Sequence, residues 1–218
     1  GFSIVAGQPI QADRVILACG GAAYAKLGAG EGAYSLASAL GHSITGIAPS
    51  LVPLCVKENS IKRLNGIRIE ASLCAYCGKK EISKSRGELL FTDYGISGPA
   101  ALDLSRGAVL NGSAGKVVCT MNLFPELSPP ALRALISGRW RALAQRPLKD
   151  FFLGMFPAQL AGAAVDELGV DARRTPQSLG PAGLDNMVAL LSDWRFEVTG
   201  PRPLSEAMVT TGGVSLGE

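Results

Sequence analysis

Several features that mark other protein classes are missing or scarce in this sequence. No apolar stretch reaches the roughly 18 residues that a membrane-spanning helix needs, because Gly, Pro or a charged residue interrupts each one. No secretory signal pattern is visible at the start. Charge of one sign is also scarce, since 21 basic and 18 acidic residues leave a net charge of +3. We therefore expect neither a membrane nor a nucleic acid as a partner.

One basic cluster stands out against this balance. It surrounds Trp140 and consists of Arg133, Arg139, Arg141, Arg146 and Lys149. Basic residues mixed with an aromatic residue can bind single-stranded nucleic acid. Because the net charge is so small, we interpret the cluster instead as the solvated face of an amphipathic helix.

Cysteine is scarce as well. Five cysteines, an odd number scattered over more than a hundred residues, indicate a reducing compartment, and we expect the cytoplasm. Cys74 and Cys77 form a CxxC, but no second pair completes the four ligands of a structural zinc site. The run 67–77 alternates as a strand does, which would point these two side chains to opposite faces. We expect reduced cysteines and no metal.

Catalytic motifs are missing too. The sequence has no serine-hydrolase elbow, Walker A loop or HExxH, and its acidic residues lack metal-ligand spacing. The single histidine, His42, could act as an acid or base, but without an obvious companion we favour a capping or packing role. The catalytic residues therefore stay unassigned, which suits a reaction whose chemistry belongs to a bound cofactor.

The sequence does contain a globular composition, with 47% hydrophobic and 18% charged residues, arranged in four zones. Residues 1–55 have an α/β pattern, with a strand at Arg14–Cys19, a helix at about 32–40 and a strand at Leu51–Val56. Residues 56–124 are rich in strands, expected at 67–77, 87–92 and 116–123, with Ser97 and Pro99 at the start of a short helix.

The other two zones complete the order. Residues 125–193 are helical, with apolar stripes that predict helices after Ser128, over 148–156, over 157–168 and over 181–192. Residues 194–218 return to strands and glycine, with an apparent strand at 206–209. A chain that leaves an α/β domain and returns to it contains an insertion, so we expect 1–55 and 194–218 to form one interrupted domain.

Glycine-rich segments follow two of the expected strands. Gly20 and Gly21 come directly after Arg14–Cys19, and Gly28, Gly30 and Gly32 precede the helix at 32–40. The run Thr210-Thr211-Gly212-Gly213 follows the strand expected at 206–209. Glycine lets the backbone approach a phosphate or a flat ring closely, and ligands of open α/β sheets bind beyond the carboxyl ends of strands. Plain turns explain the same residues, and the spacing is not the GxGxxG of a dinucleotide fold.

Four blocks of sequence, spread over nearly the whole chain, carry a family resemblance. They are ILACGGAAYAKLGAGEGAYSLASALGHSI, PSLVPL, GELLFTDYGISGPAALDLS and MVTTGGVSLGE. In this order they resemble the BaiN/YhiN-type NAD(P)/FAD-dependent oxidoreductases. The resemblance implies a Rossmann-type FAD-binding domain interrupted by a β-barrel-like domain (here 56–124) and a small helical domain (125–193).

The resemblance also implies which residues lie near the cofactor. Gly20 and Gly21 would end the strand beside the FAD, and Gly28, Gly30 and Gly32 would belong to the loop near the flavin. Thr211, Gly212 and Gly213 would lie at the isoalloxazine end. The pyrophosphate-binding GxGxxG and the C-terminal glycine-rich block of such proteins are not among these residues.

The chain begins at Gly1 and stops at Glu218 soon after a glycine-rich run, so we expect it to be the central part of a longer protein. In the intact protein we expect an FAD-dependent oxidoreductase that acts on a small organic substrate by flavin hydride transfer, with NAD(P)H as a candidate co-substrate. The alternative is a non-catalytic interaction module made of the inserted β and helical domains.

Overall fold

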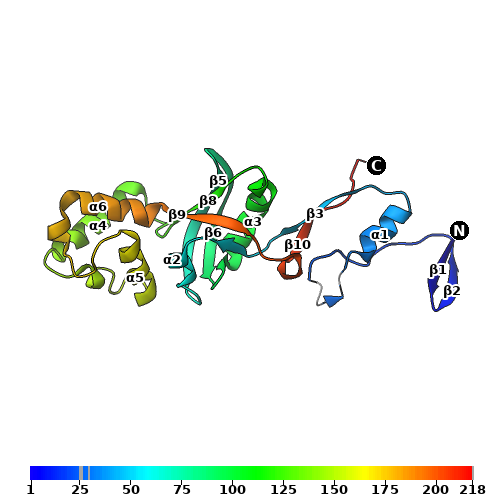
Figure 1. The fold of residues 1–218 in the computed structure, drawn as a ribbon, viewed down its shortest axis with the longest axis horizontal. Coiled ribbons are helices and arrows are strands. Elements are labelled where there is room, and N and C mark those ends of the chain that lie inside the picture. The colour runs from blue at the N-terminus through cyan, green and yellow to red at the C-terminus, as the bar shows by residue number, and fades with distance from the viewer. Residues whose placement is uncertain (25–26, 29, 218) are drawn as a thin grey trace.

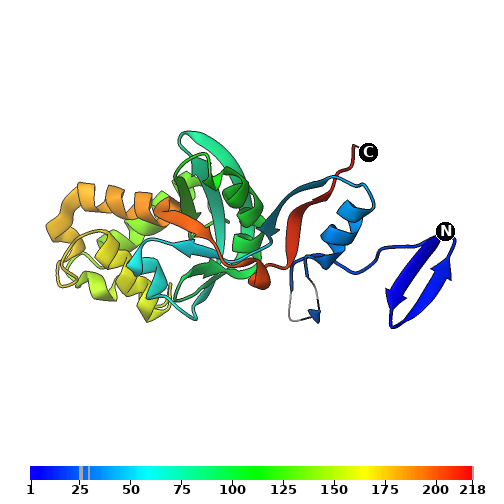
Figure 2. The same ribbon diagram turned by 45° about the vertical axis from the view of Figure 1, so that its right-hand side comes forward.

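The computed structural model describes residues 1–24, 27–28 and 30–217. Three parts follow one another along the long axis of the molecule (Figure 1). A helical part lies at one end, a β-barrel lies in the middle, and a smaller part with α1, β3 and β10 lies at the other end. Both chain termini lie on the side of this smaller part (Figures 1 and 2).

The barrel is closed and has six strands in the order β4-β7-β6-β5-β8-β9. Their bounds are β4 Leu54–Val56, β5 Arg68–Cys77, β6 Lys80–Phe91, β7 Gly95–Ser97, β8 Val117–Asn122 and β9 Trp194–Pro201. Every pairing between neighbours is antiparallel. Buried and part-exposed residues alternate strictly along β8, as the period of a strand with one face in the core requires. The expected β-barrel-like part is confirmed.

Helix α3 (Gly98–Gly112) packs against the barrel strands β5 and β6. Its buried residues are mostly small: Ala100, Ala101, Leu104, Ser105 and Ala108. At Gly107 a Cβ would lie 2.5 Å from the Cβ of Ser83, so only glycine permits this approach. Ser97 occupies the N-cap position as predicted, although the helix has 15 residues and is not short.

The helical part consists of α4 (Pro129–Ala142), η2 (Leu148–Asp150), α5 (Ala158–Glu167) and α6 (Pro176–Ser192), and α2 (Asn59–Lys62) contacts α5. Ser128 caps α4 by accepting a hydrogen bond from the Ala131 amide at 3.4 Å. The helix predicted over 148–156 is wrong, because only one 3-10 turn forms there and Gly154 has a φ of +77°. The apolar spacing there reflects Phe151 and Phe152, which are fully buried and stack edge to face.

The smaller part begins with the hairpin of β1 (Phe2–Ala6) and β2 (Gln8–Ala12) and continues through α1 (Gly32–Ala39). Strands β3 (Ile44–Ser50) and β10 (Val209–Val214) pair antiparallel, so the chain leaves this part and returns to it. β9, in the segment 194–218 that we assigned to the interrupted domain, lies instead in the barrel, as does β4.

Three strand expectations need correction here. Residues Arg14–Cys19 carry no strand in the structure, because a strand requires a paired neighbour and no described segment pairs with them. The strand predicted over Leu51–Val56 is confined to Leu54–Val56, and β3 precedes it. The strand predicted at 206–209 begins only at Val209, after the 3-10 turn η3 (Leu204–Glu206).

Candidate functional site

The segment after Cys19 turns on glycine. Gly20 has a φ of +76°, and no described residue other than its chain neighbours has an atom within 4 Å of where its Cβ would be. A Cβ on Gly21 would lie 2.7 Å from the Tyr34 hydroxyl and 3.7 Å from the Thr210 hydroxyl. The structure therefore brings Gly21 beside β10, although 189 positions separate Gly21 and Thr210 in the printed sequence.

Tyr34 connects these two segments and was missed in the sequence. It lies in the first turn of α1, and its hydroxyl is 3.3 Å from the Thr210 Oγ1, within hydrogen-bonding distance. Its ring also lies 4.0 Å from where a Cβ on Gly213 would be. Its place shortly after the glycine run was the only sequence signal, because the partner Thr210 comes from the far end of the chain.

The Thr211-Gly212-Gly213 run lies inside β10 and not in a turn. The pairing register with β3 shifts between Thr211 and Gly213, which makes Gly212 the bulged residue. A Cβ on Gly212 would lie less than 3.0 Å from the Gly46 carbonyl oxygen, and φ there is +84°. Thr45 closes the bulge by donating to the Gly213 carbonyl at 2.9 Å. Glycine is therefore needed at position 212 for the pairing of β10 with β3.

The other predicted glycines lie in open space. Gly28 has a φ of +87°, and among the described residues no atom beyond the chain neighbours lies within 4 Å of the Cβ positions of Gly28, Gly30 and Gly32. Gly32 is the first residue of α1, and Glu31 is its N-cap. The negative charge of the Glu31 carboxylate would repel a phosphate bound at this helix N-terminus. Residues 25, 26 and 29 of this loop lie outside the described residues.

A cavity of about 520 Å³ opens beside Gly20. Its walls are mainly apolar and come from both ends of the chain: Phe2, Val15, Leu17, Cys19, Gly20, Ala33, Tyr34, Ala37, Leu40, His42 and Val214. The cavity thus joins the segment expected beside the cofactor to the end of β10. His42 lines it, and its amide donates to the Ala37 carbonyl at 3.1 Å, closing the end of α1.

The open backbone at Gly20 and the apolar cavity beside it fit part of a flavin. A flat aromatic ring needs close backbone approach on one side and apolar wall on the other, and these residues supply both. The Tyr34 and Thr210 hydroxyls lie beside Gly21 and can donate to or accept from a ring edge.

The cysteines are placed for packing. The Cys74 thiol donates to the Glu81 carboxylate at 3.3 Å, while the Cys77 thiol lies 4.0 Å from the Asn111 carbonyl. Partial burial raises the pKa of Cys74, and full burial raises the pKa of Cys119 further. Within residues 1–24, 27–28 and 30–217, no three His, Cys, Asp or Glu side chains gather as metal ligands. Over the same residues, no helix combines the length and apolarity that a membrane crossing needs.

Comparison of the sequence with known proteins identifies a family for this chain. The family model "HI0933-like protein barrel and H2TH domain" matches residues 48–209. A 3-dehydro-bile acid delta(4,6)-reductase from Clostridium scindens is 30% identical over 220 residues, covering 100% of this chain and 54% of the reductase.

Two other relatives are named ribosomal RNA dihydrouridine synthases. The one from Escherichia coli is 26% identical over 222 residues (100% of this chain, 52% of the synthase), and the one from Haemophilus influenzae is 27% identical over 206 residues (94% and 48%). The chain spans about half the length of these curated relatives. The chain belongs to the HI0933-like family, the family of the BaiN/YhiN-type oxidoreductases.

Proposed function

We propose that the protein is an FAD-dependent oxidoreductase and that this chain supplies one wall of its flavin site. The observation that carries the proposal is the meeting of Gly21, Tyr34 and Thr210 beside an apolar cavity, in a chain of an oxidoreductase family. Relatives named as a reductase and as synthases match essentially the full chain, which favours an enzyme over an interaction module.

When bound, the FAD would supply the redox chemistry by accepting and donating a hydride. The residues of this chain would hold its ring: Gly20, Gly21, Gly28 and Gly30 by close backbone approach, and Thr211 and Gly213 along β10. The Tyr34–Thr210 hydroxyl pair would fix the distance between α1 and β10. The apolar residues Val15 and Leu17 would exclude water from one side of the cavity.

The exposed apolar run 15–19 supports a Rossmann-type domain around this site. Continuous apolar runs are typical of parallel strands that are covered on both faces. Here Ile16 is 90% exposed. In the intact protein the run would pair into a sheet contributed by other parts of the protein, with the barrel and the helical part inserted between β3 and β10.

The substrate we propose is a small organic molecule with a carbon–carbon double bond conjugated to a carbonyl group. A reductase acting at delta(4,6) positions and a synthase of dihydrouridine share one chemistry, the addition of hydrogen across such a double bond. NAD(P)H would reduce the flavin first. The free cysteines, with Cys19 exposed, suit a reducing cytoplasm.

A uridine in ribosomal RNA is the second candidate substrate, favoured by the names of two relatives. The charges of the helical part do not strengthen it. Residues 125–193 hold as many acidic residues as basic ones, and Arg133 of the basic cluster pairs with Asp185 at 2.7 Å. RNA binding depends on phosphate neutralisation, which such a balanced surface supplies poorly.

Anaerobic half-reactions of the full-length protein test the proposal. NADPH should bleach the flavin absorbance, and a 3-oxo-4-ene steroid should restore it. If uridine-containing RNA restores the absorbance and the steroid does not, the second candidate substrate is selected.

Gly21→Val should lower the flavin content, because its side chain would enter the space of the Tyr34 hydroxyl. Gly162→Ala, in open space on α5, is the matched control. A flavin that neither acceptor reoxidises would contradict the proposed activity.

A further inference from the structure

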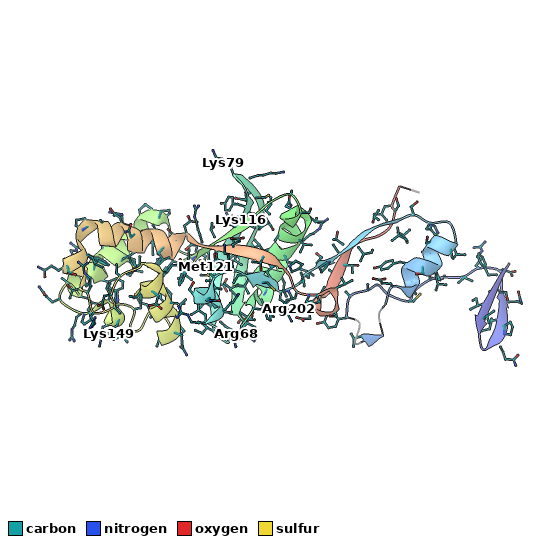
Figure 3. The ribbon with its side chains drawn as sticks, in the orientation of Figure 1. Arg68, Lys79, Lys116, Met121, Lys149 and Arg202 are labelled. Atoms are coloured by element: carbon teal, nitrogen blue, oxygen red, sulfur yellow. The ribbon has the colours of Figure 1, made fainter. Side chains whose placement is uncertain are left out.

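The barrel and the β3–β10 pair are joined by two crossings of the chain. We call residues 51–53 and 202–208 the neck. The two crossings are tied to each other by backbone hydrogen bonds, from the Arg202 amide to the Pro53 carbonyl at 2.9 Å and from the Met208 amide to the Leu51 carbonyl at 3.1 Å. Figure 3 shows Arg202 at this junction, between the barrel and β10.

The side chain of Arg202 ties the barrel to η3. Its guanidinium donates to both oxygens of the Glu206 carboxylate, at 2.7 Å and 3.0 Å. The same guanidinium lies over the Tyr94 ring, with its Cζ 4.5 Å from the ring centroid. A two-pronged ion pair combined with stacking fixes direction as well as distance, which a lysine could not do.

Tyr94 is a firm anchor because the turn that carries it is locked onto β4. The Val56 amide donates to the Tyr94 carbonyl at 3.0 Å. At the next residue, Gly95, a Cβ would lie less than 3.0 Å from the Leu54 carbonyl oxygen. The other end of the contact, Glu206, is the last residue of η3 and stands three positions before β10 begins.

The ion pair between Arg68 and Glu88 on the barrel lacks this arrangement. Arg68 and Glu88 pair at 2.6 Å across two adjacent strands, with side chains 61% and 47% exposed. That pair joins two strands of one barrel and can hold nothing else in place. Arg202 is only 33% exposed and connects the barrel to the segment that leads into Thr211 and Gly213.

We propose that Arg202 is a positioning residue that sets the position of β10, and with it Thr211 and Gly213, relative to the barrel. The catalytic consequence rests on the proposed function, whereas the structural role does not. A misplacement of about 1 Å can cost on the order of a hundredfold in rate, so loss of this contact should appear in kcat.

The experiment uses the full-length protein with Arg202→Met, and with Arg68→Met as the matched control that also breaks an Arg–Glu pair. Hydrogen exchange is measured first, because it needs no activity. Amides of residues 204–208 should exchange at least about tenfold faster in Arg202→Met, while those of β5 and β6 stay unchanged in both variants. Unchanged exchange at 204–208 would overturn the structural role.

Turnover is measured second. Arg202→Met should lower kcat about tenfold or more with KM and flavin content close to wild type, Arg202→Lys should fall between, and Arg68→Met should match wild type. A kcat within twofold of wild type in Arg202→Met, or loss of its flavin, would overturn the positioning role. A wild-type protein without flavin turnover would contradict the proposed function, while the exchange result would still decide the role of Arg202 in the neck.

Discussion

The barrel with its helices and the smaller part around β3 and β10 differ in how they bury apolar residues. Leu54, Phe91 and Trp194 of the barrel are fully buried, in one continuous core that reaches Phe151 and Leu191 of the helical part. In the smaller part, Val5, Ile16 and Leu27 are 75%, 90% and 81% exposed. The first region buries most of its large apolar side chains in its own core, whereas the second presents apolar surface of the kind that marks an interface.

The glycines show the same difference. Gly95, Gly98 and Gly107 are packed so closely against barrel backbone or side chains that a Cβ would clash. In the part of the chain that the structure describes, no atom beyond the chain neighbours lies within 4 Å of the Cβ positions of Gly20, Gly28 and Gly30. Glycine in the barrel therefore serves internal packing, and Gly20, Gly28 and Gly30 leave the backbone open to another group.

Truncation of a large side chain should lower the free energy of unfolding far more in the barrel than in the smaller part, and this is the largest effect that we expect. Phe91→Ala should lower the free energy of unfolding by about 3–5 kcal/mol, because it leaves a cavity in the barrel core. Phe2→Ala, on the 42% exposed side chain of the hairpin, should cost less than about 1 kcal/mol in this chain. Urea denaturation of the two variants measures the difference, and equal losses would remove the contrast between the regions.

Addition of a single methyl group should separate the two kinds of glycine. Gly95→Ala should cost at least about 2 kcal/mol, since φ is +155° and the new Cβ would meet the Leu54 carbonyl. Gly30→Ala should change stability by less than about 0.5 kcal/mol, because its surroundings are open. Thermal unfolding compares them. A well-folded Gly95→Ala protein with an unshifted Tm would show that the barrel tolerates what its geometry forbids.

Thiol chemistry sharpens the comparison further. Burial raises the pKa of Cys119 in β8, so at pH 8 little thiolate is present and no reagent reaches it. Cys19 is exposed in the smaller part. We expect Cys19 to react with a disulfide reagent at least about a hundredfold faster in the native chain. Stopped-flow absorbance with Cys19→Ser and Cys119→Ser variants assigns the phases. Fast labelling of Cys119 would mean that the barrel opens readily.

The smallest effect on stability should come from a surface ion pair in the helical part, between Asp171 and Arg173. The Arg173 side chain and amide lower the pKa of Asp171 to about 2. A lowered folded-state pKa adds stability above the ordinary carboxyl pKa of about 4, and that stability is lost as pH falls from about 4 to 2. Arg173→Gln should return the Asp171 pKa toward its ordinary value with little change in stability at pH 7. Carboxyl NMR titration measures this; an unchanged pKa would contradict the pairing.

The sequence predicted those elements whose signal is local. The alternation of 67–77 and 116–123 matched β5 and β8, and the apolar stripes after Ser128 and over 157–168 matched α4 and α5. The run 148–156 failed because its helix-like spacing arises from Phe151 and Phe152 packing into a core between helices. β3 was missed because Pro49 and Gly46 weaken its strand pattern and its partner β10 is distant in sequence.

The candidate site was predictable only in part. Gly20, Gly21 and Gly213 were found because glycine in runs is visible in sequence, and their flavin contacts stay a prediction. Tyr34 and Arg202 were missed because each acts through a partner, Thr210 or Tyr94, that only the folded chain brings near. For Gly212 the structure gives a reason that the sequence could not, the close approach of Gly46 across the β-bulge.

Flavin binding by the full-length protein tests the central claim most directly. The purified protein should be yellow, and the absorbance of the FAD released on denaturation should correspond to about one FAD per chain. The 218-residue chain alone should bind FAD more weakly than micromolar, because several charge-assisted hydrogen bonds worth about 1.5–3 kcal/mol each would be missing. Micromolar or tighter binding by this chain would show that the cofactor site is misplaced. A colourless full-length protein that FAD cannot reconstitute would contradict the flavoenzyme account itself.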